Sequence, residues 1–194
     1  MALRGGKGAV ILAAAMFASG RGAAAGPPDT PTVVLHVTDY VHVPPHELQE
    51  AQTLAAEVYT RIGVRLVWTD GFAAACGDDD GARHLDVIIL TPEMTAQRKA
   101  KPGTFGAGSR LTRHAFIYYQ RAIDHAIETR SDPRRVLGLV LAHETGHMLL
   151  PVYSHSESGL MRAEWEGRLA KIPDFLPSQA DEIRKELGDP KSPH

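Results

Sequence analysis

The sequence predicts an α+β fold, and three observations support this class. Short segments rich in β-branched residues have the length of strands, one segment has an apolar stripe at helical spacing, and a longer one is apolar nearly all round. The strands are expected at 32–37, 64–68, 85–91 and 114–119. The helices are expected at 45–62, 121–129, 134–150 and 178–187.

The N-terminal elements follow from composition and periodicity. The segment 32–37 is short and β-branched, which is typical of a strand. The next helix opens at Pro45 or one residue later, and Gly63 stops it. The strand 64–68 alternates apolar and polar residues, whereas 85–91 is almost continuously apolar and is therefore expected at the centre of the sheet.

The elements in the second half depend on glycine and proline signals. The glycine-rich segment 103–108 lacks the lysine and the following helix of a phosphate-binding loop, so we expect a flexible connection before the strand 114–119. Asp132 is a helix N-cap candidate, and Pro133 suits the first helical position. The helix 134–150 that follows is apolar on most sides, which indicates that it is buried.

That buried helix contains the motif His143-Glu144-Thr145-Gly146-His147. Two histidines four residues apart lie on the same face of a helix, so their imidazoles can bind one metal ion, and Glu144 lies beside them without being a ligand. Neutral nitrogens that hold Zn²⁺, an open position for water and a carboxylate that accepts the water's proton are the parts of a metal-assisted hydrolase. The alternative is a buried pair of histidines satisfied by protein partners.

With its continuation, the motif resembles that of the metzincin zinc peptidases, and most of all the matrixin pattern. A later histidine followed by serine, His155-Ser156, and the pair Leu160-Met161 match the third ligand and the methionine turn of that family. The resemblance implies a small mixed sheet with the metal-binding helix packed on it in an α/β-type upper part, 31–150. It also implies a short helical lower part, 151–190.

The chain departs from the family pattern at the third ligand. Metzincins have that histidine where Tyr153 stands here, and a helix-ending glycine where Leu150 stands. Pro151 can end the helix instead, because proline disfavours a helical conformation in the residue before it. We therefore expect His155 as third ligand, with Glu164, in the style of gluzincins, as the main alternative and Tyr153 as a further one.

The N-terminus has the three parts of a secretory signal peptide: a basic start, a short apolar run and small residues before a cleavage site. We expect residues 1–25 to be removed and 26–194 to form a single exported domain, periplasmic or extracellular, with no membrane attachment. The only cysteine is Cys76, so an internal disulfide is excluded. The net charge of −2 does not indicate a nucleic acid partner.

The resemblance implies a monomeric zinc-dependent peptidase that acts on a peptide or protein, with the strand 114–119 as the sheet edge that pairs with the substrate. Two alternatives remain at this stage. One is an exported zinc-binding module without turnover, and the other is a zinc amidase or cell-wall peptide hydrolase. Six other histidines have no mutual spacing that suggests a site, and we expect them to be surface or satisfied core residues: His36, His42, His46, His84, His114 and His125.

Overall fold

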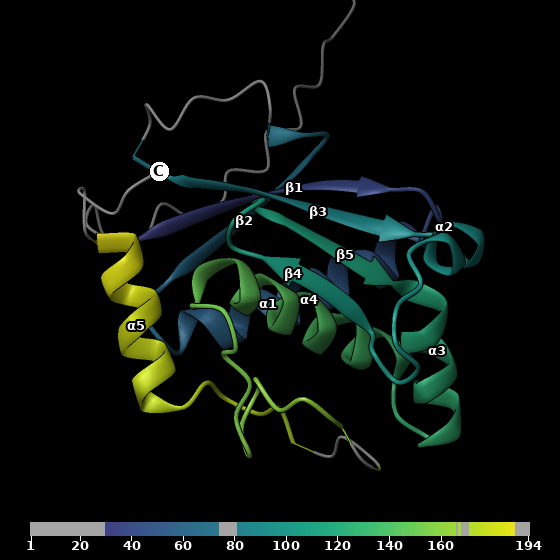
Figure 1. Cartoon of the computed structure of the whole chain (residues 1–194). Coiled ribbons are helices and arrows are strands. Elements are labelled where there is room, and N and C mark those ends of the chain that lie inside the picture. Colours follow the sequence, from purple (N-terminus) through teal and green to yellow (C-terminus); the bar gives the residue numbers. More distant parts are fainter. Residues whose placement is uncertain (1–29, 74–80, 166, 168–170, 189–194) are drawn as a thin grey trace, which may run out of the picture.

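The computed structural model of the chain contains a five-stranded sheet with helices packed on it (Figure 1). It describes residues 30–73, 81–165, 167 and 171–188. The strands are β1 (Thr32–Asp39), β2 (Arg65–Asp70), β3 (Arg83–Leu90), β4 (Gly106–Ser109) and β5 (His114–Tyr118). The helices are α1 (Pro45–Thr60), α2 (Pro92–Gln97), α3 (Tyr119–Glu128), α4 (Pro133–Leu149) and α5 (Pro177–Gly188).

The strands lie in the order β2-β1-β3-β5-β4. The pairs β2–β1, β1–β3 and β3–β5 are parallel, whereas β4 runs antiparallel to β5 at one edge of the sheet. This mostly parallel sheet, with helices packed on it and a C-terminal helix, confirms the predicted α+β class. The predicted signal peptide and Cys76 lie outside the described residues, and no described helix is both long and apolar enough to cross a membrane.

Strand β3 is central, as its nearly continuous apolar sequence predicted, and all of its residues after Arg83 are buried. Helices α1 and α4 lie together on one side of the sheet (Figure 1). They approach closely at Gly138, where a Cβ atom would meet the backbone oxygen of Ala51 at 2.7 Å. The buried hydroxyl of Tyr59 in α1 donates a hydrogen bond of 3.1 Å to the carbonyl of Ala142 in α4. The backbone just before His143 is thus tied to the neighbouring helix.

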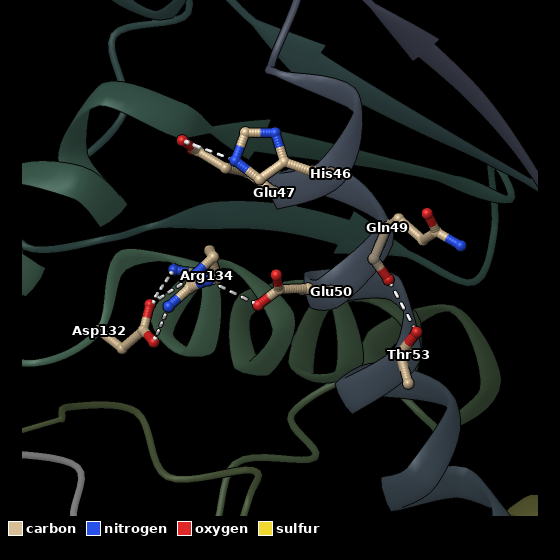
Figure 2. Close-up of polar contacts among 7 residues, drawn as sticks. All are labelled: His46, Glu47, Gln49, Glu50, Thr53, Asp132 and Arg134. Carbon is tan, nitrogen blue, oxygen red and sulfur yellow. Dashed lines mark hydrogen bonds and ion pairs between the residues drawn. The ribbon is translucent and has the colours of Figure 1, made fainter.

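Helix α4 begins where the sequence predicted. The Asp132 side chain accepts a hydrogen bond from the backbone N–H of Arg134, which satisfies one free donor of the first turn (Figure 2). The Arg134 guanidinium also pairs with Glu50 of α1 at 2.8 Å (Figure 2). These side chains are largely exposed, so the ion pair itself adds little stability, whereas the cap fixes the start of the helix.

Two expectations about the sheet edge are wrong. The segment 103–108 is not only a flexible connection, because Gly106–Ser109 forms β4, and the strand 114–119 is not the edge, because β4 covers it. Glycine is disfavoured in strands, which is why the sequence suggested a loop. In the structure glycine is needed there, since a Cβ atom on Gly106 would lie 2.6 Å from the side chain of Glu144 and one on Gly108 would lie 2.8 Å from Cβ of His147.

Candidate metal centre

Three histidines meet at the C-terminal half of α4. The Nε2 atom of His147 lies 3.1 Å from that of His143 and 3.0 Å from that of His155. The nitrogens offered by the three side chains all lie within 4.8 Å of one another, and no other such group of three or more potential ligands occurs in the described part of the chain. This arrangement is consistent with a zinc site.

The two alternative third ligands do not join this group. Glu164 is exposed and is not among the residues that line the cavity at the histidines. Tyr153 is 96 % exposed, so its hydroxyl faces solvent. Of the three candidates named from the sequence, the structure brings only His155 to the helical pair.

The path from α4 to His155 explains how this histidine reaches the helical pair. Leu150 leaves the helix with an extended backbone (φ −93°, ψ 159°), the conformation that a following proline favours. The chain then reverses at Tyr153, which has a φ of +67°. Ser154 follows directly, and its Oγ lies 3.2 Å from Nδ1 of His147.

The outer nitrogens of the two helical histidines are held by protein groups. Nδ1 of His143 lies 2.8 Å from the carbonyl oxygen of Leu160, and because a carbonyl can only accept, Nδ1–H is the donor. Its Nε2 therefore presents a lone pair to the other two rings. A single N–H on His147 cannot make linear hydrogen bonds to both neighbours, so a shared cation satisfies the three nitrogens better than protons do.

Burial keeps the helical imidazoles neutral. Burial and, less strongly, His155 lower the pKa of His143 to about 4, although the hydrogen bond with Leu160 acts in the opposite direction. Burial and the two neighbouring histidines lower the pKa of His147 to about 3. The pKa of His155 is also lowered, again by burial. The three side chains are thus in the neutral form that binds a metal ion, and a three-nitrogen donor set with room for a further ligand fits Zn²⁺.

Met161 packs against the helix that carries His143 and His147. It is fully buried, and a Cβ atom on Gly146 would be 2.6 Å from its sulfur, so the glycine lets methionine pack directly on α4 at the residue before His147. The turn that precedes it includes Gly159, with a φ of +78°. The N–H of Leu160 donates to the carbonyl of Asp174 at 2.8 Å, which fixes this turn from outside.

Glu144 lies beside the histidines and not among them. Its side chain is buried, and Oε2 accepts a hydrogen bond of 2.7 Å from the backbone N–H of Gly108 in β4. Burial raises the pKa of the carboxyl group to about 8, although the bond from Gly108 acts in the opposite direction. A cation bound at the histidines would stabilise the ionised form and lower this pKa.

The histidines and Glu144 line a cavity of about 220 Å³. One wall is the segment 103–108, which includes the start of β4, and the other is formed by residues that follow Met161, Arg162 and Trp165 among them. The sequence did not reveal the first wall, although glycines at every second position, Gly106 and Gly108, mark one face of a strand that has no room for side chains.

Two of the remaining histidines form a buried pair on the other face of the sheet. His36 Nε2 and His84 Nδ1 lie 2.9 Å apart, and both side chains are buried. Burial and the neighbouring His84 lower the pKa of His36. These two residues belong to the satisfied core, as expected.

No protein-family model matches this chain, and no curated protein sequence matches it. The nature of the site therefore rests on its own geometry: a mixed α+β fold with three converging histidines that can hold a metal ion.

Proposed function

We propose that the protein is an exported zinc-dependent peptidase in which His143, His147 and His155 hold the metal. The observation that supports hydrolysis best is the position of Glu144, whose carboxyl group lines the same cavity as the histidines. A purely structural zinc site has four protein ligands and no need of a neighbouring carboxylate in an accessible cavity.

The chain's own residues supply binding and proton transfer. Glu144 takes the proton of the attacking water and passes it to the leaving amine, while the Gly108 N–H holds one of its oxygens in place. Bound Zn²⁺ supplies Lewis-acid activation of the water and of the scissile carbonyl. His143 is fixed in the metal-binding tautomer by the carbonyl of Leu160.

An extended substrate peptide would pair with β4. This short strand is bonded to β5 on one side only, and it forms a wall of the cavity that contains Glu144. Pairing with a strand edge aligns a peptide by its backbone, so the scissile bond can be set beside the metal whatever the side chains are. In this role β4 replaces the strand 114–119 that the sequence suggested.

The test compares metal content and hydrolysis in the purified protein, His155→Ala and Glu144→Gln. Elemental analysis after dialysis should find zinc in the unchanged protein and in Glu144→Gln, and most of it should be lost from His155→Ala. Hydrolysis of casein and of short peptides should disappear in Glu144→Gln. Full retention of zinc by His155→Ala would move the third ligand elsewhere, with Glu164 the next candidate.

The same experiment separates the alternatives. If Glu144→Gln and the unchanged protein bind zinc equally and neither hydrolyses any substrate, the protein is a zinc-binding module without turnover. Hydrolysis of short cell-wall peptides but not of casein would indicate a cell-wall peptide hydrolase or amidase. Export is tested by the N-terminal sequence of the protein recovered from the periplasm or medium, which should begin at Gly26.

A further inference from the structure

The cavity at the metal centre has an uneven distribution of charge. Apart from the histidines, only Glu144 and Arg162 carry ionisable side chains among the described residues that line it. Glu144 is buried and is held by β4, whereas the side chain of Arg162 is exposed. A peptide that enters the cavity thus meets one cationic side chain.

Arg162 is tightly positioned along the backbone. The carbonyl of Leu160 bonds to Nδ1 of His143, and Met161 packs on α4, so the two preceding residues are anchored to the metal-binding helix. The carbonyl of Met161 also accepts a hydrogen bond of 2.9 Å from the N–H of Ser156, and Arg162 forms a parallel bridge with that serine. The Arg162 side chain is therefore attached to a backbone that is held in place, one residue after the buried Met161.

Several other arginines of the chain have carboxylate partners. Arg61 pairs with Asp174, and Arg134 pairs with Glu50 and Asp132. Arg162 takes part in none of the ion pairs among the residues that the structure describes. Its guanidinium is thus available to a carboxylate brought by another molecule, and arginine binds carboxylates with two parallel hydrogen bonds.

We propose that Arg162 binds a carboxylate of the substrate beside the scissile bond, so that the site selects acidic peptides. This inference rests on the peptidase function proposed above and adds the substrate class to it. The carboxylate belongs either to an acidic side chain or to the C-terminus of the peptide. Since Arg162 contacts the substrate away from the reacting atoms, it acts on specificity and not on proton transfer.

The test uses peptides with blocked ends that differ only in having Glu, Gln or Lys at each position around one cleavable bond. The Gln peptide is also made with a free C-terminal carboxylate, which separates the two sources. We compare the unchanged protein with Arg162→Gln, Arg162→Lys and Arg98→Gln. Arg98 is exposed and lies over the ring of Phe116, outside the cavity. Arg98→Gln is therefore the control, because it removes the same charge from the protein as Arg162→Gln without changing the cavity.

We expect one carboxylate-bearing peptide to have a kcat/KM about ten-fold above its neutral counterpart, mainly through KM, as one charge-assisted contact implies. Arg162→Gln should lose this preference, Arg162→Lys should recover part of it, and Arg98→Gln should keep it. Equal kcat/KM for acidic and neutral peptides, or an unchanged preference in Arg162→Gln, would overturn the inference and leave the peptidase function standing.

A binding measurement makes the result independent of turnover. Fluorescence anisotropy of labelled peptides on zinc-loaded Glu144→Gln should show the acidic peptide bound about ten-fold more tightly, and Arg162→Gln added to this background should abolish the difference. If no peptide is hydrolysed by the unchanged protein but this difference in binding is found, the peptidase function fails and carboxylate recognition by Arg162 stands. If the two peptides bind equally, recognition by Arg162 fails.

Discussion

The backbone N–H of Gly108 donates a hydrogen bond of 2.7 Å to Oε2 of Glu144, and this bond joins the edge of the sheet to the helix of the candidate metal centre. Glycine is required on the strand for the contact, because a side chain at this position would collide with the backbone of Glu144 and with His147. The same strand thus positions the proposed general base and forms one wall of the cavity.

The first prediction concerns this contact. Gly108→Ala should lower the free energy of unfolding by about 1–3 kcal/mol, because the new methyl group would collide with the backbone oxygen of Glu144 and with Cβ of His147. Urea denaturation measures the change. Gly188→Ala is the control, since a Cβ atom there meets nothing within 4 Å. Equal stability of the two variants would show that β4 can move away from α4 without loss.

The second prediction concerns the outer nitrogen of His147. Ser154→Ala removes the hydroxyl that lies 3.2 Å from Nδ1, so the affinity for zinc should fall by about ten-fold. Competition with a chromophoric chelator measures this affinity. Ser178→Ala, in the first turn of α5, is the control and should bind zinc like the unchanged protein. If Ser154→Ala does so too, the hydroxyl does not orient the ligand.

The third prediction is a pH dependence of stability in the zinc-free protein. The pKa of Glu144 is about 8 in the folded state, above its ordinary value of 4.5, so the folded state keeps a proton that the unfolded state releases. Glu144 therefore lowers the free energy of unfolding as pH rises through this range, by about 1.6 kcal/mol between pH 6.5 and 8, and the two histidines offset about half of this change. His143 and His147 have lowered pKa values, so the unfolded state binds more protons below pH 6.5, and stability falls again as pH decreases towards 4.

Urea denaturation across pH tests this dependence. For the zinc-free protein these groups place the optimum near pH 6.5, between the two opposing effects. Glu144→Gln should remove the fall above pH 6.5 and keep the one below it. A parallel decline of both proteins between pH 6.5 and 8 would assign the alkaline effect to other groups.

The fourth prediction concerns the support of α4 by α1. Tyr59→Phe removes the buried hydroxyl that donates to Ala142 and should lower the free energy of unfolding by about 1 kcal/mol, with little change in packing volume. The zinc content should stay the same, because the substitution changes none of the three histidines. Thermal denaturation and elemental analysis on one preparation test both parts, and loss of zinc would show that this bond also sets the ligand geometry.

Much of the fold could be predicted because its signals are local. The cap at Asp132, the apolar run of α4 and the continuously apolar β3 depend on residues close in sequence, and the structure confirms them. Strand β4 could not be predicted in this way. Its glycines resemble a loop by composition. Only the proximity of Glu144 and His147 in α4, more than thirty residues later in the chain, explains why no larger residue is present.

The candidate site also has a part that the sequence predicts and a part that only the tertiary structure places. The spacing of His143, Glu144 and His147 is a property of one helix, so the sequence alone was enough to place two nitrogens on one face with a carboxylate beside them. The arrival of His155 depends on where Pro151 ends α4 and on the reversal at Tyr153. The hydrogen bond from β4 to Glu144 and the cavity wall that contains Arg162 depend on packing between distant segments. Helical periodicity fixes the first set of positions, whereas the others are fixed only when the sheet, α4 and the segment after it pack together.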